Sequence, residues 1–175
     1  MASLDELRTL APTIAERLAE RLTATGLGFV GTVRADGWPR VSPMEVSIID
    51  GRLWCGSMPN AVKALDLRRD PRCCLVTPLA DKDDLWGEVK AFCRAKEIAD
   101  VDTWERIRKV WLDAIDLDIG EPGGSHLFEL DIEAAAWQRV EGDTWRTTSW
   151  AAGEPVRERV RVGALGESQE LPTPA

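Results

Sequence analysis

Residues able to bind an anion gather at the start of one short predicted helix. The helical run 61–69 follows Asn60 and is closed by Asp70-Pro71, and Lys63 falls in its first turn. A helix N-terminus presents unpaired backbone N–H groups and the positive end of the helix dipole, so it attracts phosphate or carboxylate groups. Asn60 would cap the helix, and Lys63 would add a full positive charge. The pattern predicts an anion site, and a solvated lysine beside an ordinary cap is the alternative.

Polar side chains on two neighbouring strands could complete this site. Ser57 places a hydroxyl directly before the helix, and Arg40 and Ser42 alternate with Val41 on an earlier strand. Side chains two residues apart on a strand point to the same face, so Arg40 and Ser42 would face one crevice. Together with Lys63, these residues outline a phosphate pocket.

Other reactive side chains give no comparable pattern. The four cysteines lack C-x-x-C spacing. The only histidine, His126, has no other metal-ligand residues clustered near it, and the sequence has no G-x-S-x-G motif that would provide the nucleophile of a catalytic triad. We therefore expect a structural His126, no metal site and four buried, reduced thiols. Catalytic residues remain unassigned. The cysteines are Cys55, Cys73, Cys74 and Cys93.

Three short strands around two Asp-Gly pairs must position the anion site. Asp36-Gly37 and Asp50-Gly51 each lie between apolar runs, which predicts hairpins with type I′ turns because both central residues then need positive φ. The sequence thus predicts an antiparallel meander directly before the short helix. Its strands are 29–34, 39–49 and 52–56.

Helices are predicted at the start of the chain and late in it. Ser3 and Glu6 have the spacing of a capping box, Pro12 suits the first turn of a second helical stretch, and Gly26 can end it. A later helix is predicted to open at Asp102, with Glu105 completing a capping box. Its apolar stripe is interpreted as core, with ligand stacking as the alternative for the tryptophans. The stripe comprises Trp104, Ile107, Trp111 and Ile115.

The remaining patterns predict a mainly β (α+β) fold, a closed or nearly closed antiparallel barrel with peripheral helices. We divide the chain into an N-terminal helical segment, 1–26, the barrel domain, 27–162, and a flexible tail, 163–175, which is poor in large apolar residues. The later predicted strands are 72–77, 89–96, 126–132, 135–140 and 144–150.

Composition narrows the possible partners. The chain has 175 residues, 44% of them hydrophobic, and 22 Lys and Arg against 30 Asp and Glu give a net charge of −8. The basic residues are scattered, which disfavours nucleic acid as a partner. No apolar run reaches the length of a membrane span, and the first residues do not resemble a signal peptide, so we expect a cytoplasmic protein that does not bind membranes.

The ordered set of these motifs resembles a known family. The stretch GTVRADGWPRVSPMEVSIIDGRLWCGSMPNAVKALDLRRDPRC combines strand, D-G turn, G-x-P, strand, D-G turn, strand, serine, a lysine in a short helix and L-R-R-D-P-R. It is similar to the FMN-binding split-barrel superfamily of the pyridoxamine 5′-phosphate oxidase type, including its deazaflavin-dependent reductase branch. The resemblance covers about residues 27–132 and implies a six-stranded antiparallel split β-barrel.

The resemblance also implies a homodimer that holds FMN, or alternatively the deazaflavin coenzyme, at two interface sites. Ser57 and Lys63 match phosphate-binding positions, whereas residues 40–44 match the strand beside the isoalloxazine ring. Ser42 falls where the phosphate oxidase has arginine, and Asp66 where many members have asparagine. The expected cofactor-binding residues are Arg40, Val41, Ser42, Pro43, Met44, Ser57, Asn60 and Lys63.

Three functions follow as hypotheses. The first is an FMN- or deazaflavin-dependent oxidoreductase that transfers hydride to or from a small organic substrate. Pyridoxamine phosphate is not the expected substrate, because the stretch AAGEPVRERVRV lacks the substrate-binding motif of the true phosphate oxidase. The second is a non-catalytic flavin- or tetrapyrrole-binding protein on the same barrel. The third is a barrel that has lost its ligand and serves as an interaction module.

Overall fold

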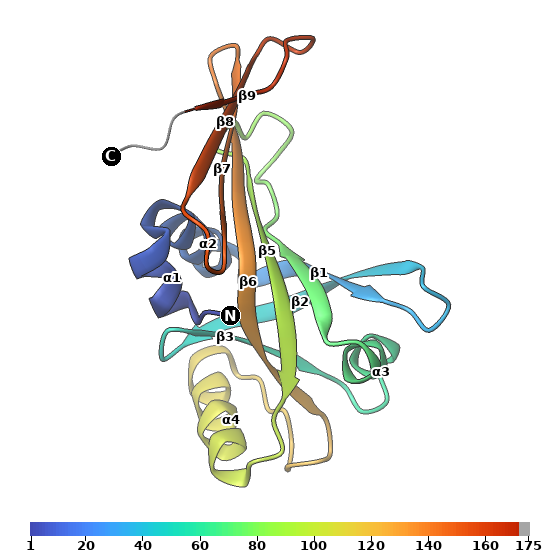
Figure 1. Cartoon of the computed structure of the whole chain (residues 1–175). Coiled ribbons are helices and arrows are strands. Elements are labelled where there is room, and N and C mark those ends of the chain that lie inside the picture. The colour runs from blue at the N-terminus through green and yellow to red at the C-terminus, as the bar shows by residue number, and fades with distance from the viewer. Residues whose placement is uncertain (172–175) are drawn as a thin grey trace.

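The computed structural model describes residues 1–171 and shows a closed, antiparallel six-stranded barrel extended by three further strands (Figure 1). The strand order is β3-β2-β1-β4-β5-β6, and pairing of β3 with β6 closes the barrel. Strands β7, β8 and β9 continue the sheet outward from β6. The predicted mainly β fold and six-stranded barrel are confirmed. The strands are β1 (Leu27–Val33), β2 (Pro39–Ile49), β3 (Arg52–Ser57), β4 (Arg72–Val76), β5 (Glu88–Glu97), β6 (His126–Glu141), β7 (Thr144–Ala151), β8 (Arg157–Val162) and β9 (Gln169–Leu171).

The two predicted hairpins form, and they use different turns. Asp50 and Gly51 have φ of 50° and 67°, so the β2–β3 turn has the positive φ at both central residues that the type I′ prediction requires. In the β1–β2 loop only Gly37 has positive φ, 85°. There Arg34 N–H donates to the Trp38 carbonyl at 2.9 Å, which closes a three-residue loop. The type I′ prediction at Asp36-Gly37 is therefore wrong, because the loop holds one residue more than that turn allows.

Within residues 1–171, four helices flank the barrel, and local side-chain interactions determine where they begin and end. Ser3 and Glu6 form the predicted capping box, and Gly26 ends the second helix with φ of 65°, as predicted. The last helix begins two residues earlier than predicted, because Asp100 and not Asp102 is its N-cap and accepts from the Thr103 N–H at 2.8 Å. The helices are α1 (Leu4–Leu10), α2 (Pro12–Thr25), α3 (Val62–Arg69) and α4 (Val101–Ile115).

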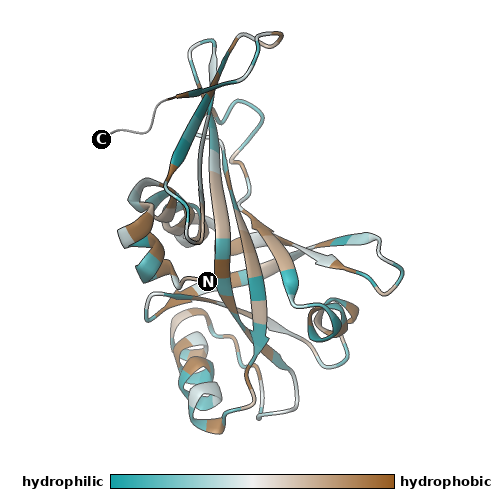
Figure 2. Cartoon of the chain, viewed as in Figure 1, coloured by the Kyte–Doolittle hydropathy of each residue, from teal (hydrophilic) through white to brown (hydrophobic). Residues whose placement is uncertain are grey.

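The hydrophobic core has two parts, one on each face of β3. Leu53 and Cys55 point into the barrel, where the main cluster also takes in the buried faces of α1 and α2. Trp54 points outward to a second cluster with α4. In Figure 2 hydrophobic segments lie on these helices and strands, whereas β8 is largely hydrophilic. The predicted core role of Trp104 and Trp111 is confirmed, but Ile115, at the end of the same stripe, is 53% exposed.

The C-terminal part differs most from the sequence prediction. Residues 126–141 form one strand, β6, because the predicted break is only a register shift opposite Phe92/Cys93. Strands β8 and β9 were not predicted, and β9 lies within the segment 163–175 that was predicted as a flexible tail. Residues 172–175 of that segment lie outside the described residues. Within residues 1–171, no helix combines the length and apolarity needed to span a membrane.

Two glycines with similar backbone conformations allow a matched test of how the 78–87 loop packs on β6. Gly87 and Gly142 have φ of 72° and 65°. A Cβ on Gly87 would lie 1.6 Å from the Gln138 carbonyl oxygen, whereas a Cβ on Gly142 would meet no atom within 4 Å.

We therefore predict that Gly142→Ala lowers the free energy of unfolding by about 1 kcal/mol, the strain of a left-handed alanine. Gly87→Ala should lower it by clearly more, because the β6 backbone must also move. Urea denaturation of both variants measures the difference. Equal losses would contradict the close packing of Gly87 on β6.

Candidate functional site

The barrel is split where β2 and β3 stop pairing. Their ladder runs only from Val46 opposite Cys55 to Ile49 opposite Arg52. Before Val46, β2 pairs with β1 alone, and the end of β3 pairs with β6. The two strands therefore separate at the level of Glu45 and Gly56. This seam supplies backbone and side chains that the barrel does not use for its own closure.

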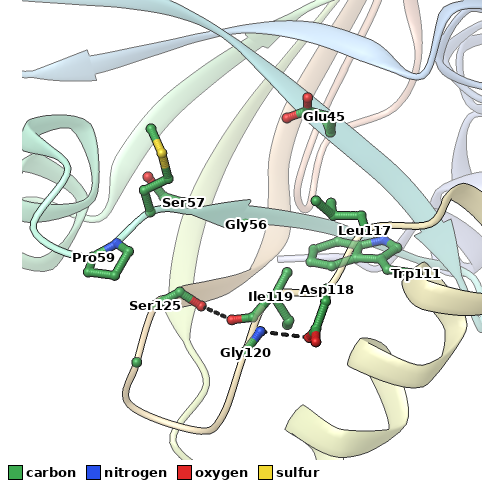
Figure 3. A pocket seen from close by; sticks show the side chains of 12 residues that line it. Glu45, Gly56, Ser57, Pro59, Trp111, Leu117, Asp118, Ile119, Gly120 and Ser125 are labelled. Carbon is green, nitrogen blue, oxygen red and sulfur yellow. Dashed lines mark hydrogen bonds between the residues drawn. The ribbon is translucent and has the colours of Figure 1, made fainter.

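A cavity of about 380 Å³ opens at this seam. The end of β3 forms one wall, and α4 with the loop 117–125 forms the other; in Figure 3 Trp111, Leu117 and Ile119 lie beside the strand that carries Gly56 and Ser57. Such a volume is in the range of small-molecule sites. Its walls are Glu45, Gly56, Ser57, Met58, Pro59, Trp111, Leu117, Asp118, Ile119, Gly120, Gly124 and Ser125.

The loop that covers the cavity is fastened to α4. Arg108 pairs with Asp118 at 2.7 Å and with Glu121 at 2.9 Å. The hydrogen bond from Arg108 is the main reason why the pKa of Asp118 is lowered. Trp104 Nε1 donates to the Gly120 carbonyl at 3.0 Å. Contacts within the chain therefore hold the outer wall of the cavity in place without a ligand.

The predicted anion site lies at the start of α3, and one of its residues was assigned wrongly. The helix begins at Val62 with Ala61 at the N-cap position, and no side chain caps it. Asn60 instead has φ of 58°, the left-handed conformation of a turn residue. The capping role predicted for Asn60 is therefore wrong, because the chain turns at Asn60 before the helix begins. The first backbone N–H groups of α3 are left without a side-chain acceptor.

Lys63 is a half-buried cation without a carboxylate partner in the described chain. The ion pairs of α3 in residues 1–171 involve Asp66, Arg68 and Arg69, and none involves Lys63. Burial raises the pKa of the Cys55 thiol on the inner face of β3, and the Lys63 charge opposes that rise.

Ser57 lies two residues beyond Cys55 on that inner face. It is 9% exposed, and its Oγ has no hydrogen-bond partner among the described residues. A buried hydroxyl without a partner is unfavourable unless a ligand or solvent satisfies it. Lys63, Ser57 and the uncapped start of α3 thus leave their hydrogen-bonding capacity unused on neighbouring segments.

Arg40 does not join this group, because it binds Asp66. Arg40 Nε donates to Asp66 Oδ2 at 2.7 Å, Thr32 Oγ1 donates at 3.1 Å, and Arg69 lies 3.3 Å from the other oxygen. Burial would raise the pKa of Asp66, but the hydrogen bonds from Arg40, Thr32 and Arg69 outweigh it and the pKa is lowered. Asp66 therefore stays ionised and offsets the charge that Arg40 was expected to offer an anion.

The other residues predicted on β2 divide between its two faces. Ser42 is half-buried and lies opposite Val30, on the face of Arg40, and Met44 on the same face is buried in the core. Val41 and Pro43 are exposed on the outer face. The structure therefore places Arg40 and Ser42 on one face as predicted, but it does not bring all eight predicted residues to one surface.

A second polar group, which the sequence reasoning missed, lies beside Ser57. His126 is directly opposite Ser57 in the β3–β6 ladder, and its Nδ1 lies 2.7 Å from Glu97 Oε1. Arg68 Nε approaches the other oxygen of Glu97 at 3.0 Å. The interpretation of His126 as a structural residue agrees with these contacts. Only the strand register, which no short motif reveals, brings these residues together.

A closed antiparallel barrel with one split seam and a short helix beside it defines a split-barrel protein. The family model of pyridoxamine 5′-phosphate oxidase matches residues 14–138. The chain belongs to this family, which confirms the resemblance drawn from the sequence. No curated protein sequence matches the chain.

Solved structures show the same fold at low sequence identity. The heme binding protein from Mycobacterium smegmatis has 22% identity and a TM-score of 0.62, over 77% of this chain and 57% of that one. This chain therefore spans little more than half of that protein. A general stress protein 26-related protein of the pyridoxinephosphate oxidase family from Clostridium acetobutylicum has 15% identity and a TM-score of 0.61, over 81% and 95% of the two chains. HutZ, the heme storage protein from Vibrio cholerae, has 20% identity and a TM-score of 0.53, over 71% and 90%.

The Asp66 network predicts a specific dependence of stability on pH. A carboxylate whose pKa is lowered by folding stabilises the native state above the ordinary pKa of aspartate, about 3.9, and this contribution disappears as the pH falls through the native pKa. We predict that Asp66→Asn lowers the free energy of unfolding by about 2 kcal/mol at neutral pH, because Arg40 loses its charged partner.

The difference between wild type and Asp66→Asn should shrink as the pH is lowered below about 3.9. Urea denaturation across this range measures it. Asp36→Asn is the control, since the Asp36–Arg34 pair borders the same surface at 2.8 Å but is half-exposed. A constant difference at all pH values, or an equal effect of the control, would contradict the role given to Asp66.

Proposed function

We propose that this protein binds the phosphate of FMN at the start of α3 and acts as an oxidoreductase with that cofactor. The deazaflavin coenzyme is the alternative, since it offers the same kind of anionic group. The observation that carries the proposal is the set of unused donors: the Lys63 ammonium, the buried Ser57 hydroxyl and the uncapped N–H groups of Val62 and Lys63. Phosphate satisfies such a set better than a neutral ligand does.

The seam cavity lies next to the anion site and could hold the ring of the cofactor. The segment from Gly56 to Pro59 lines the cavity and leads directly to α3. A cofactor anchored by its phosphate at α3 would reach the seam between β2 and β3 with its ring. The bound cofactor would carry the hydride, and the chain's contribution is orientation, exclusion of water and electrostatics. The substrate is a small organic molecule, and no residue of the chain is assigned as acid or base.

A homodimer is part of this proposal. Val41 and Phe92 are 67% and 47% exposed on the outer face of the sheet. In the strand register they lie in one row, through Gly31 and Cys74. Phe29, two residues along β1 from Gly31, is 43% exposed beside them. An exposed apolar row on a sheet marks an interaction surface, and a second copy would cover it and border the seam.

We predict that light scattering shows a dimer at micromolar concentration, with a buried area above about 1,000 Å². Phe92→Arg should shift the protein toward monomer, because it places a charge in the apolar row. The matched control is Val162→Arg on β8, where an exposed valine lies outside the row. A wild-type monomer, or equal dissociation of both variants, would contradict this interface.

A tetrapyrrole is the second candidate ligand, favoured by two observations. Solved relatives include a heme binding protein and a heme storage protein. The only histidine of this chain, His126, is oriented by Glu97 through Nδ1, as metal-binding histidines usually are. His126 does not line the seam cavity, however, which favours the flavin. Addition of hemin tests this candidate. A Soret band that appears with the wild type and is lost in His126→Ala would favour tetrapyrrole binding over the flavin proposal.

Substitution of Lys63 tests the flavin proposal. Lys63→Ala removes one charge-assisted contact, so FMN affinity should fall about ten- to a hundredfold, and Lys63→Arg should retain part of it. Titrations followed by fluorescence at low and high salt, with FMN and with the deazaflavin coenzyme, measure the change. Lys82→Ala is the control, since Lys82 is an exposed lysine whose ion pair is with Asp83.

Equal FMN affinities of wild type, Lys63→Ala and Lys82→Ala would place the phosphate elsewhere and contradict the proposal. Turnover of the reduced cofactor with an electron acceptor then separates an enzyme from a non-catalytic carrier. The cytoplasmic location also belongs to the proposal. It agrees with the free state of all four cysteines in the structure, although only Cys55, Cys73 and Cys93 are buried as predicted and Cys74 is half-buried.

A further inference from the structure

Three of the four cysteines lie inside the barrel. Cys55, Cys73 and Cys93 belong to the main buried cluster, whereas Cys74 is half-buried and lies opposite the exposed Phe92. Cys73 and Cys93 are direct partners in the β4–β5 ladder, so their side chains leave the sheet on the same inner face. Within residues 1–171, no other two cysteines are partners in a strand ladder.

The strand register gives this pair the backbone spacing of a disulfide. The Ala95 N–H donates to the Pro71 carbonyl at 2.8 Å, two positions along the same ladder. Hydrogen-bonded pairs recur at every second position of an antiparallel ladder, so Cys73–Cys93 is such a pair, with Cα atoms about 5.5 Å apart. Disulfides join Cα atoms roughly 4.4 to 6.8 Å apart. The two strands therefore need no large movement to be linked.

The thiols of the pair also interact with each other. The Cys73 side chain is the main reason why the pKa of the Cys93 thiol is raised, and burial is the next. Burial is the main reason why the pKa of Cys55 is raised, and Cys73 adds to that rise. Protonated, buried thiols react slowly, so Cys93 and Cys55 are poor first targets for an oxidant.

We propose that Cys73 and Cys93 form a reversible oxidation site, at which hydrogen peroxide converts the two thiols into a disulfide that links β4 to β5. Cys73 is the more exposed of the two, 7% against 2%, and reacts first. Its sulfur attacks one peroxide oxygen, the O–O bond breaks, and a sulfenic acid and water form. The Cys93 sulfur then displaces the hydroxyl group, so the S–S bond forms and a second water leaves. The thiols lose two protons and two electrons, which reduce the peroxide to water.

The disulfide would strengthen the sheet where its pairing is least regular. The β5–β6 ladder shifts its register between Phe92 and Cys93, and such a bulge disrupts the ladder locally. A covalent link at Cys93 holds β5 to its other neighbour, β4, at the same position. Disulfide formation also protects a thiol from irreversible oxidation. The inference concerns the barrel interior and does not depend on the proposed cofactor.

Thiol mapping of the folded full chain tests the inference. Reduced protein is treated with hydrogen peroxide, alkylated in denaturant and digested without reduction. We expect a cross-linked pair of peptides that contains Cys73 and Cys93, while Cys55 stays free. Treatment of the oxidised protein with dithiothreitol should remove the cross-link and restore both thiols.

Two alanine variants at neighbouring positions locate the reaction. Cys73→Ala should abolish the cross-link. Cys74→Ala changes the next residue of the same strand, which lies on the opposite face, and should leave the yield of the cross-link unchanged. Thermal melts establish that both variants are folded. Cys93→Ala removes the other thiol of the pair and keeps the test valid where Cys73→Ala does not fold.

Absence of a cross-link in the folded wild type would overturn the inference. A Cys55–Cys73 link would also overturn it, because thiols facing each other across the barrel would then be the reactive pair. A Cys73–Cys93 link that forms only in urea would do the same, since the fold would not supply the geometry. Equal loss of the cross-link in Cys73→Ala and Cys74→Ala would contradict the assignment to the inner face.

Discussion

The change of partner along β2 is the constraint on which the rest of the structure depends. Up to Glu45 the strand pairs with β1, and from Val46 onward it pairs with β3 instead. Because β3 pairs with β6 along its other edge, from Leu53 to Ser57, the barrel closes without using the seam between Glu45 and Gly56. A fully paired barrel would fill this space with ladder hydrogen bonds. The split leaves a cavity beside a core that is complete without it.

Charge is distributed unevenly around that seam. Asp66 gathers Thr32, Arg40 and Arg69 into one network, which fastens α3 to β1 and β2. This network uses the arginine that the sequence alone offered to an anion, and it leaves Lys63 as the available cation of α3. Asp66 therefore has a structural role: its hydrogen bond with Arg40 makes that arginine part of the scaffold.

Local signals predicted much of the fold, and long-range pairing accounts for the failures. The boundaries of β2, the capping box at Ser3 and the end of α2 at Gly26 depend on neighbouring residues and were found from the sequence. Of the residues predicted for the site, Ser57 and Lys63 have unused polar groups at the start of α3, whereas Asn60 only turns the chain. The Arg40–Asp66 pair and the His126–Ser57 neighbourhood join residues 26 to 69 positions apart, which no short motif encodes. Strand β9 was not predicted because Gln169–Leu171 is polar and very short.

The central claim is that unused donors at the start of α3 bind a cofactor phosphate, and a comparison of FMN with riboflavin tests it most directly. The two molecules share the ring system and differ by the phosphate alone. Equilibrium dialysis at low salt should show FMN bound at least about tenfold more tightly, since the phosphate gains charge-assisted hydrogen bonds that the hydroxyl of riboflavin does not form. Equal binding of FMN and riboflavin would contradict the account.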